Sequence, residues 1–206
     1  MDPVDVALCL AVDASASVDH DEFGLMMGGL AAAFRDPEVV RAATAGPRGA
    51  AAVALVLWSG VGEHATAVDW MRIAGPAGAE AAAAAVDDAP RAVAPGPTAL
   101  GEGMGAGLAL LAACPFPPER LVLDVSGDGQ ANAGPSPAPV RDAGVSAGVT
   151  INALAVLNEE PDLVAHYAAH VIGGPGAFVI SCGDYADFVG AIRRKLIREL
   201  RGDLTT

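Results

Sequence analysis

Apolar residues in this chain form several short unbroken runs, and the stretches between them alternate apolar with polar positions. Runs of this length, bounded by Gly, Pro or Asp, are typical of strands covered on both faces, as in a parallel sheet. A shorter segment at 65–70 is expected to form an antiparallel edge strand, and 177–180 to close the sheet. The unbroken runs that predict the central strands lie at 5–12, 50–58, 121–125 and 149–156.

The segments between these runs carry helix signals. Ser17 or Asp19 can cap a helix at 19–34, and Asp36-Pro37 is expected to end it. Strands that alternate with helices predict an α/β fold, in which a mainly parallel sheet is wrapped by helices on both faces. A length of 206 residues is normal for one such unit, so we expect a single domain spanning 1–206. The remaining helices are predicted at 77–86, 98–113, 136–147, 161–171 and 185–200.

Net charge and composition limit the classes of function that the protein can have. The net charge of −13 argues against nucleic acid, because phosphate binding needs a basic surface, and it favours cations or basic partners. Aromatic residues make up only 4% of the chain, so the core must consist mainly of Ala, Val and Leu. Cys9, Cys114 and Cys182 are widely separated, and we expect buried, unreactive thiols and no disulfide.

The chain shows no apolar stretch of 18 residues or more, and its first residues carry no basic segment followed by an apolar run. We therefore expect neither a membrane span nor a signal peptide in the sequence as it stands. This predicts a cytoplasmic protein, or a periplasmic or secreted one if a leader has been removed.

The first strand ends in the run Asp13-Ala14-Ser15-Ala16-Ser17, an acid followed by two hydroxyls spaced two residues apart. In open α/β folds this places the three side chains at the carboxyl edge of the sheet, where ligands bind. Three oxygen donors do not complete the six-fold shell of a hard divalent cation, so further donors are needed. Two later segments supply them, Thr98 before a helix and Asp128 after a strand. The predicted metal ligands are Asp13, Ser15, Ser17, Thr98 and Asp128.

Oxygen-only ligation favours Mg²⁺, Mn²⁺ or Ca²⁺ over zinc or copper, and a small, partly hydrated site favours Mg²⁺. In this order, the D-x-S-x-S run, a threonine about 80 residues later and a strand ending in Asp128-Gly129 resemble the von Willebrand factor type A family and its metal-ion-dependent adhesion site. Further segments resemble a bacterial, uncharacterised branch of that family: 58–60, 126–129, 171–178 and 192–196. One departure is Ala16, where the family often has glycine.

The resemblance implies a Rossmann-like sheet of six strands in the order 3-2-1-4-5-6. It also implies a function, a protein-interaction module in which a glutamate or aspartate of a partner protein completes the shell of the bound cation. Many bacterial members are thought to serve AAA+ ATPases, so such an ATPase is one predicted partner. On this interpretation the protein is not an enzyme.

The alternative is a Mg²⁺-dependent phosphatase similar to the haloacid dehalogenases, since Asp13 ends the first strand and an Asp-Gly segment begins at Asp128. That chemistry needs a second acid two residues after the nucleophile, where this chain has Ser15. Its only lysine, Lys195, follows the Asp-Gly segment instead of preceding it, and we expect it on a solvated basic face of the last helix.

Other polar residues are weaker candidates. His166 and His170 are spaced as two zinc ligands on a helix but lack a third ligand nearby in sequence, so we expect surface residues. His20 is expected at the start of a helix, on the rim of the site. Asp124 lies inside a predicted strand and is expected to be buried and structural.

Overall fold

The computed structural model describes residues 1–158 and 160–202, and six strands within them form one sheet. The sheet order is β3-β2-β1-β4-β5-β6, and β2 and β3 are its antiparallel pair. The predicted fold class, strand order and antiparallel edge strand are therefore confirmed. The strands are β1 (Val4–Asp13), β2 (Ala51–Trp58), β3 (His64–Ile73), β4 (Pro118–Gly127), β5 (Val149–Val156) and β6 (Val179–Cys182).

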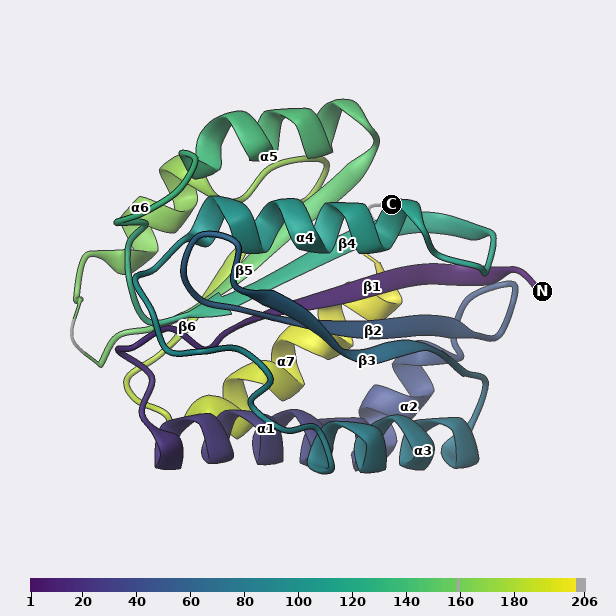
Figure 1. The fold of residues 1–206 in the computed structure, drawn as a ribbon. Coiled ribbons are helices and arrows are strands. Elements are labelled where there is room, and N and C mark those ends of the chain that lie inside the picture. The colour runs from purple at the N-terminus through teal and green to yellow at the C-terminus, as the bar shows by residue number, and fades with distance from the viewer. Residues whose placement is uncertain (159, 203–206) are drawn as a thin grey trace.

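Helices cover both faces of the sheet (Figure 1). One face carries α1 (His20–Arg35), α2 (Pro37–Ala43), α3 (Pro76–Asp87) and α7 (Phe188–Arg201). The other carries α4 (Leu100–Ala112), α5 (Pro137–Ser146) and α6 (Leu163–His170). None of the described helices is both long enough and apolar enough to cross a membrane.

The helix α2 differs from the prediction that Asp36-Pro37 only ends the preceding helix. Pro37 occupies the first turn of α2, where the missing N–H of proline costs no hydrogen bond. The side chain of Asp36 caps this helix by accepting a hydrogen bond from the Glu38 N–H at 2.7 Å. The same dipeptide therefore stops one helix and starts the next.

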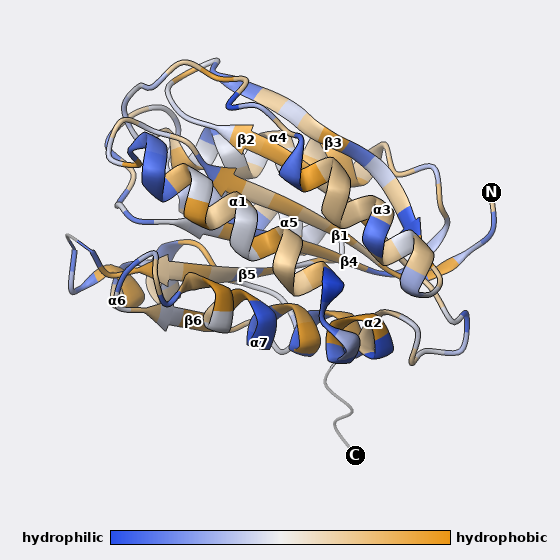
Figure 2. Cartoon of the chain, turned by 90° about the horizontal axis from the view of Figure 1, so that it is seen from below, coloured by the Kyte–Doolittle hydropathy of each residue, from blue (hydrophilic) through white to orange (hydrophobic). Residues whose placement is uncertain are grey.

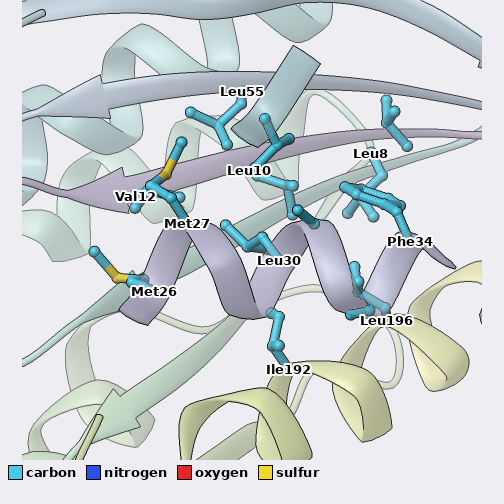
Figure 3. Close-up of a cluster of buried hydrophobic side chains, with 14 of the residues drawn as sticks. Leu8, Leu10, Val12, Met26, Met27, Leu30, Phe34, Leu55, Ile192 and Leu196 are labelled. Atoms are coloured by element: carbon cyan, nitrogen blue, oxygen red, sulfur yellow. The ribbon is translucent and has the colours of Figure 1, made fainter. Parts of the chain in front are cut away.

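The core lies in two apolar layers because side chains along β1 alternate between the two faces of the sheet. Leu10 belongs to the layer under α1 and α7, and Cys9 to the layer under α4. In Figure 3, α1 lies between β1 and α7, with Leu10 on one side and Ile192 on the other. In Figure 2 the inner strands carry apolar residues, whereas α7 carries both apolar and polar residues.

The layer under α4 is thin because the residues of β1 that face it are small. A Cβ added to Gly107 of α4 would lie 2.5 Å from Leu123 Cδ1, and one added to Gly103 would enter the indole ring of Trp58. Glycine at these positions lets the helix approach the sheet closely, at the cost of weaker intrinsic helix propensity.

Lys195 of α7 is not on a solvated face, as predicted, but is fully buried. Its Nζ lies 2.6 Å from Asp124 Oδ2 of β4 and 2.6 Å from Glu199 Oε1. Asn152 Nδ2 also donates to Glu199 Oε1, at 2.9 Å, and Ser126 Oγ donates to Asp124 Oδ1 at 3.2 Å. Asp124 is thus buried and structural, as expected. Burial, followed by the charge of Asp124, raises the pKa of Glu199 above its usual range.

We predict that Lys195→Met destabilises the fold by about 3–5 kcal/mol, because it leaves two buried carboxyl groups without their cation. Urea denaturation of the variant and the wild type at neutral pH measures the difference. Arg194→Met is the matched control, because Arg194 is the exposed neighbour on the same helix and its loss should cost no more than about 0.5 kcal/mol. Equal losses for both variants would contradict a structural role for the buried lysine.

Candidate functional site

Asp13 ends β1 in the middle of the sheet and is fully buried. Its Oδ1 accepts a hydrogen bond from the Ser15 N–H at 2.7 Å, which turns the chain immediately after the strand. The loop closes at Asp19, whose side chain and that of Glu22 cap the first turn of α1 reciprocally. The predicted cap at Asp19 is present. The two serines are therefore held in a short loop between a buried strand and a firmly capped helix.

Asp128 reaches the same place from the neighbouring strand. β1 and β4 pair in parallel, with Val12 opposite Ser126, so their carboxyl ends lie side by side (Figure 1). Ser17 Oγ donates to Asp128 Oδ1 at 2.7 Å, and the hydroxyl oxygens of Ser15 and Ser17 are 3.2 Å apart. Residues 111 positions apart in sequence thus form one hydrogen-bonded cluster.

Thr98 joins this cluster from the segment before α4. Its N–H donates to Asn132 Oδ1 at 2.8 Å, and the Asn132 N–H donates back to the Thr98 carbonyl at 3.1 Å. The segments that carry Thr98 and Asp128 are therefore tied together. A Cβ added to Gly129, next to Asp128, would lie 3.6 Å from Thr98 Oγ1. All five predicted ligand residues are brought to one edge of the sheet.

Ala16 fits the loop without strain. Among the described residues no non-glycine residue has a positive φ, so alanine meets no backbone penalty here. Its N–H donates to the Gly96 carbonyl at 2.8 Å. The departure from glycine at this position is therefore compatible with the geometry of the loop.

The two carboxyl groups of the cluster each keep one oxygen without a partner. Asp13 Oδ2 and Asp128 Oδ2 are buried and accept no hydrogen bond in the described structure. Burial, followed by the negative charge of Asp128, raises the pKa of Asp13 to about 7. A Cβ at Gly127 would lie 2.9 Å from Asp13 Oδ2, so glycine leaves room beside that oxygen.

These features fit a hard divalent cation. The donor set consists of two carboxylates and three hydroxyls, with no nitrogen or sulfur, and it carries two negative charges when both acids are ionised. Without a cation, burial and the charge of Asp128 disfavour the ionised form of Asp13. A cation between them would remove that cost and use the unpartnered oxygens.

Two supporting residues were not singled out from the sequence. Asn132 clamps Thr98, and the buried Tyr167 of α6 donates from its hydroxyl to the Gly129 carbonyl at 3.3 Å. The one sequence feature that could have indicated a role for Asn132 is its position four residues after Asp128. Tyr167 had no signal, because its position in an apolar helix is that of an ordinary core residue.

The histidine candidates lie on two helices, His166 and His170 on α6 and His20 on α1. The ring centroids of His166 and His170 lie 4.9 Å apart on successive turns of α6, with the ring planes tilted by 51°. Within residues 1–158 and 160–202, no group of three or more His, Cys, Asp or Glu side chains is arranged to hold a metal. His20 is exposed at the start of α1.

Comparison with known proteins supports the fold. A family profile described as "Protein of unknown function (DUF1194)" matches residues 3–204. No curated protein matches the sequence.

Three solved structures share the architecture. One is the pilus adhesin SpaC from Lactobacillus rhamnosus GG (TM-score 0.66, 15% identity, 98% of this chain and 31% of that chain). Another is a von Willebrand factor type A protein from Catenulispora acidiphila (TM-score 0.62, 16% identity, 96% of this chain and 43% of that one). The third is proximal thread matrix protein 1 from the mussel byssus, with a zinc-occupied MIDAS motif (TM-score 0.61, 16% identity, 97% and 48%).

At these identities the likeness establishes a von Willebrand factor type A-like fold alone. The chain spans between about a third and a half of the length of these three proteins.

We predict that Asp13→Asn changes the pH dependence of stability in a metal-chelating buffer. The folded-state pKa of about 7 lies above the unfolded value near 4, so the native carboxyl keeps a proton that the unfolded chain has lost. Wild-type stability therefore falls as pH rises between these values. Relative to wild type, Asp13→Asn should gain about 3 kcal/mol between pH 5 and pH 8, at roughly 1.4 kcal/mol per pKa unit.

Denaturation at the two pH values measures this gain. Asp69→Asn, on an exposed position of β3, serves as the control and should show none of it. If the stability of both variants follows the wild-type pH profile, neither burial nor the charge of Asp128 raises the pKa of Asp13 in the folded protein.

Proposed function

Because this chain belongs to the DUF1194 family and has a von Willebrand factor type A-like fold, we propose that it is a metal-dependent protein-interaction module. In this proposal Asp13, Ser15, Ser17, Thr98 and Asp128 hold a divalent cation, and a carboxylate of a partner protein completes its shell. The observation that carries the proposal is the pair of unpartnered, buried oxygens on Asp13 and Asp128, surrounded by hydroxyl groups.

The donor chemistry explains why a partner is needed. Hydroxyl ligands are neutral, so a cation bound mainly through them keeps much of its attraction for a further anionic oxygen. Ser17 is exposed, whereas Asp13 and Ser15 are fully buried, so the cluster opens to solvent on the Ser17 side. Solvent access there leaves room for a group from another protein. An oxygen-only set favours Mg²⁺, although the zinc-occupied MIDAS of the mussel protein makes Zn²⁺ a necessary competitor in any test.

The phosphatase alternative is less well supported. The acid that it needs two residues after Asp13 is replaced by Ser15, whose N–H instead holds Asp13 in place. Lys195 is buried between Asp124 and Glu199, so it is not available to bind a phosphate at the carboxyl edge. Turnover of a generic phosphate ester is therefore the outcome that would reopen this alternative.

Two of the similar structures are described as a pilus adhesin and as a matrix protein of the mussel byssus. They support an interaction role for the fold without naming a partner for this chain. The AAA+ ATPase stays a prediction from the family resemblance. The cellular location likewise stays a prediction from the sequence.

We predict that the wild type binds one divalent cation per chain and that Asp128→Ala weakens binding at least about tenfold, because even residues that only orient metal ligands contribute on that scale. Isothermal titration with Mg²⁺, Mn²⁺, Ca²⁺ and Zn²⁺ measures the affinities. Asp69→Ala is the matched control and should bind as the wild type does. Phosphate-ester turnover is assayed on the same samples. No binding by the wild type, or equal binding by Asp128→Ala, contradicts the proposed site.

We further predict that the bound cation accepts an external carboxylate. With Mn²⁺ bound, acetate should displace coordinated water and lower the water-proton relaxation rate, while acetamide, which is uncharged, should not. Free Mn²⁺ at matched acetate concentration is the reference for binding in solution. Identical responses to acetate and acetamide would show that the cation does not select an anionic oxygen.

A further inference from the structure

One arginine outside the proposed ligand set contacts most of the loop that carries the two serines. Arg91 lies in the segment between α3 and α4, and its Nη2 donates to the carbonyl oxygens of Ala14, Ser15 and Val18 at 2.9, 2.9 and 2.8 Å. Nη1 lies 3.4 Å from the Asp19 carbonyl. A single guanidinium group therefore donates hydrogen bonds to four of the six backbone carbonyls that follow Asp13.

These contacts determine how the peptide groups of the loop are oriented. Buried carbonyls need a hydrogen-bond donor, and Arg91 supplies one here beside the backbone, since the Ser15 carbonyl also accepts from the Val18 N–H at 3.2 Å and the Asp19 carbonyl from the Phe23 N–H at 3.0 Å. The Ser15 carbonyl accepts a hydrogen bond from Arg91, and the Ser15 N–H donates one to Asp13 Oδ1. Both backbone polar groups of Ser15 are therefore held in place. The Ser15 hydroxyl then lies toward Ser17, and the Ser17 hydroxyl toward Asp128.

Arg91 is itself anchored from two sides. Its guanidinium lies 5.5 Å from the centre of the Phe23 ring on α1, within the range of a cation–π contact. The segment that carries it also accepts the Ala16 N–H at the Gly96 carbonyl. At its far end the same segment carries Thr98, and the Ala99 N–H donates to the Ser59 carbonyl at 2.9 Å. One segment thus links the serine loop to the threonine.

We infer that Arg91 is a positioning residue for the proposed cation site, which holds the serine loop so that the hydroxyls of Ser15 and Ser17 face the carboxylates. The inference rests on the proposed function. The predicted ligand set consists of the D-x-S-x-S run, Thr98 and Asp128, and this arginine has no part in it. The planar fork of arginine can bind several carbonyls at once, whereas lysine is a single point charge. Charge alone therefore does not replace it.

The test compares Mn²⁺ affinities of the wild type, Arg91→Met and Arg91→Lys, measured by water-proton relaxation. Arg91→Met should lose affinity about tenfold or more, as for other residues that orient metal ligands. Arg91→Lys should recover only part of this loss. Added methylguanidinium, at concentrations well below those that denature proteins, should restore affinity to a smaller Arg91→Ala variant and should not affect the wild type.

The matched control is Arg35→Met. Arg35 makes ion pairs with Glu80 and Asp87 on the helical layer, at 2.9 and 2.7 Å, and its loss should change stability without changing Mn²⁺ affinity. If Arg91→Met does not fold, Arg91→Lys and the rescue of Arg91→Ala decide the question. Wild-type affinity in Arg91→Lys together with no rescue overturns the inference.

The two proposals fail in different ways. If the wild type binds no cation, the proposed function fails, and the inference about Arg91 fails with it. If the wild type binds Mn²⁺ and Asp128→Ala does not, but the Arg91 variants bind as tightly as the wild type, only the role of Arg91 is overturned.

Discussion

The parallel pairing of β1 with β4 is the interaction on which the rest of this structure depends. It places the ends of two buried strands side by side, and β1 ends in an acid while β4 is followed at once by one. Asp13 and Asp128 therefore meet at the carboxyl edge although they are far apart in sequence. The helices cover both faces of the sheet, and both acids are buried. The location, the burial and the mutual repulsion of the two acids all follow from that pairing.

The protein contains a second pair of buried carboxyl groups, and the contrast between the two pairs is informative. Asp124 and Glu199 share the ammonium group of Lys195, which lies 2.6 Å from each. The chain thus supplies the cation for that cluster, as the rules for buried charge require. Asp13 and Asp128 have no lysine between them, and each keeps an unpartnered oxygen. Glu199 Oε2 also lacks a hydrogen-bond partner, so what separates the two pairs is the cation: the ammonium group of Lys195 lies between one pair of buried carboxyl groups, and the other pair has no lysine beside it.

The incomplete cluster costs stability in the absence of metal, because desolvation and like charge both oppose ionisation of Asp13. Structural clusters are seldom left in this condition, whereas binding sites often keep strain or unpaired groups that a ligand relieves. Arg91 and Asn132 bind backbone groups of the loops and make no hydrogen bond to Asp13 Oδ2 or Asp128 Oδ2, which keep no partner. Rigid loops around unpaired oxygens are what a cation site needs to bind without reorganising the protein.

Apart from the short helix α2, the sequence by itself determined the order of strands and helices along the chain, because these elements are marked locally by an apolar run, a cap or a proline. It also marked Asp13, Ser15 and Ser17, since they follow one strand directly. Only the tertiary structure decided the surroundings of these residues. The burial of Lys195 depends on the distance between α7 and Asp124 on β4, and the role of Arg91 depends on a loop that folds back over residues 14–19. Neither has a local signature, because a side chain that pairs across the fold has the same sequence pattern as one that faces water.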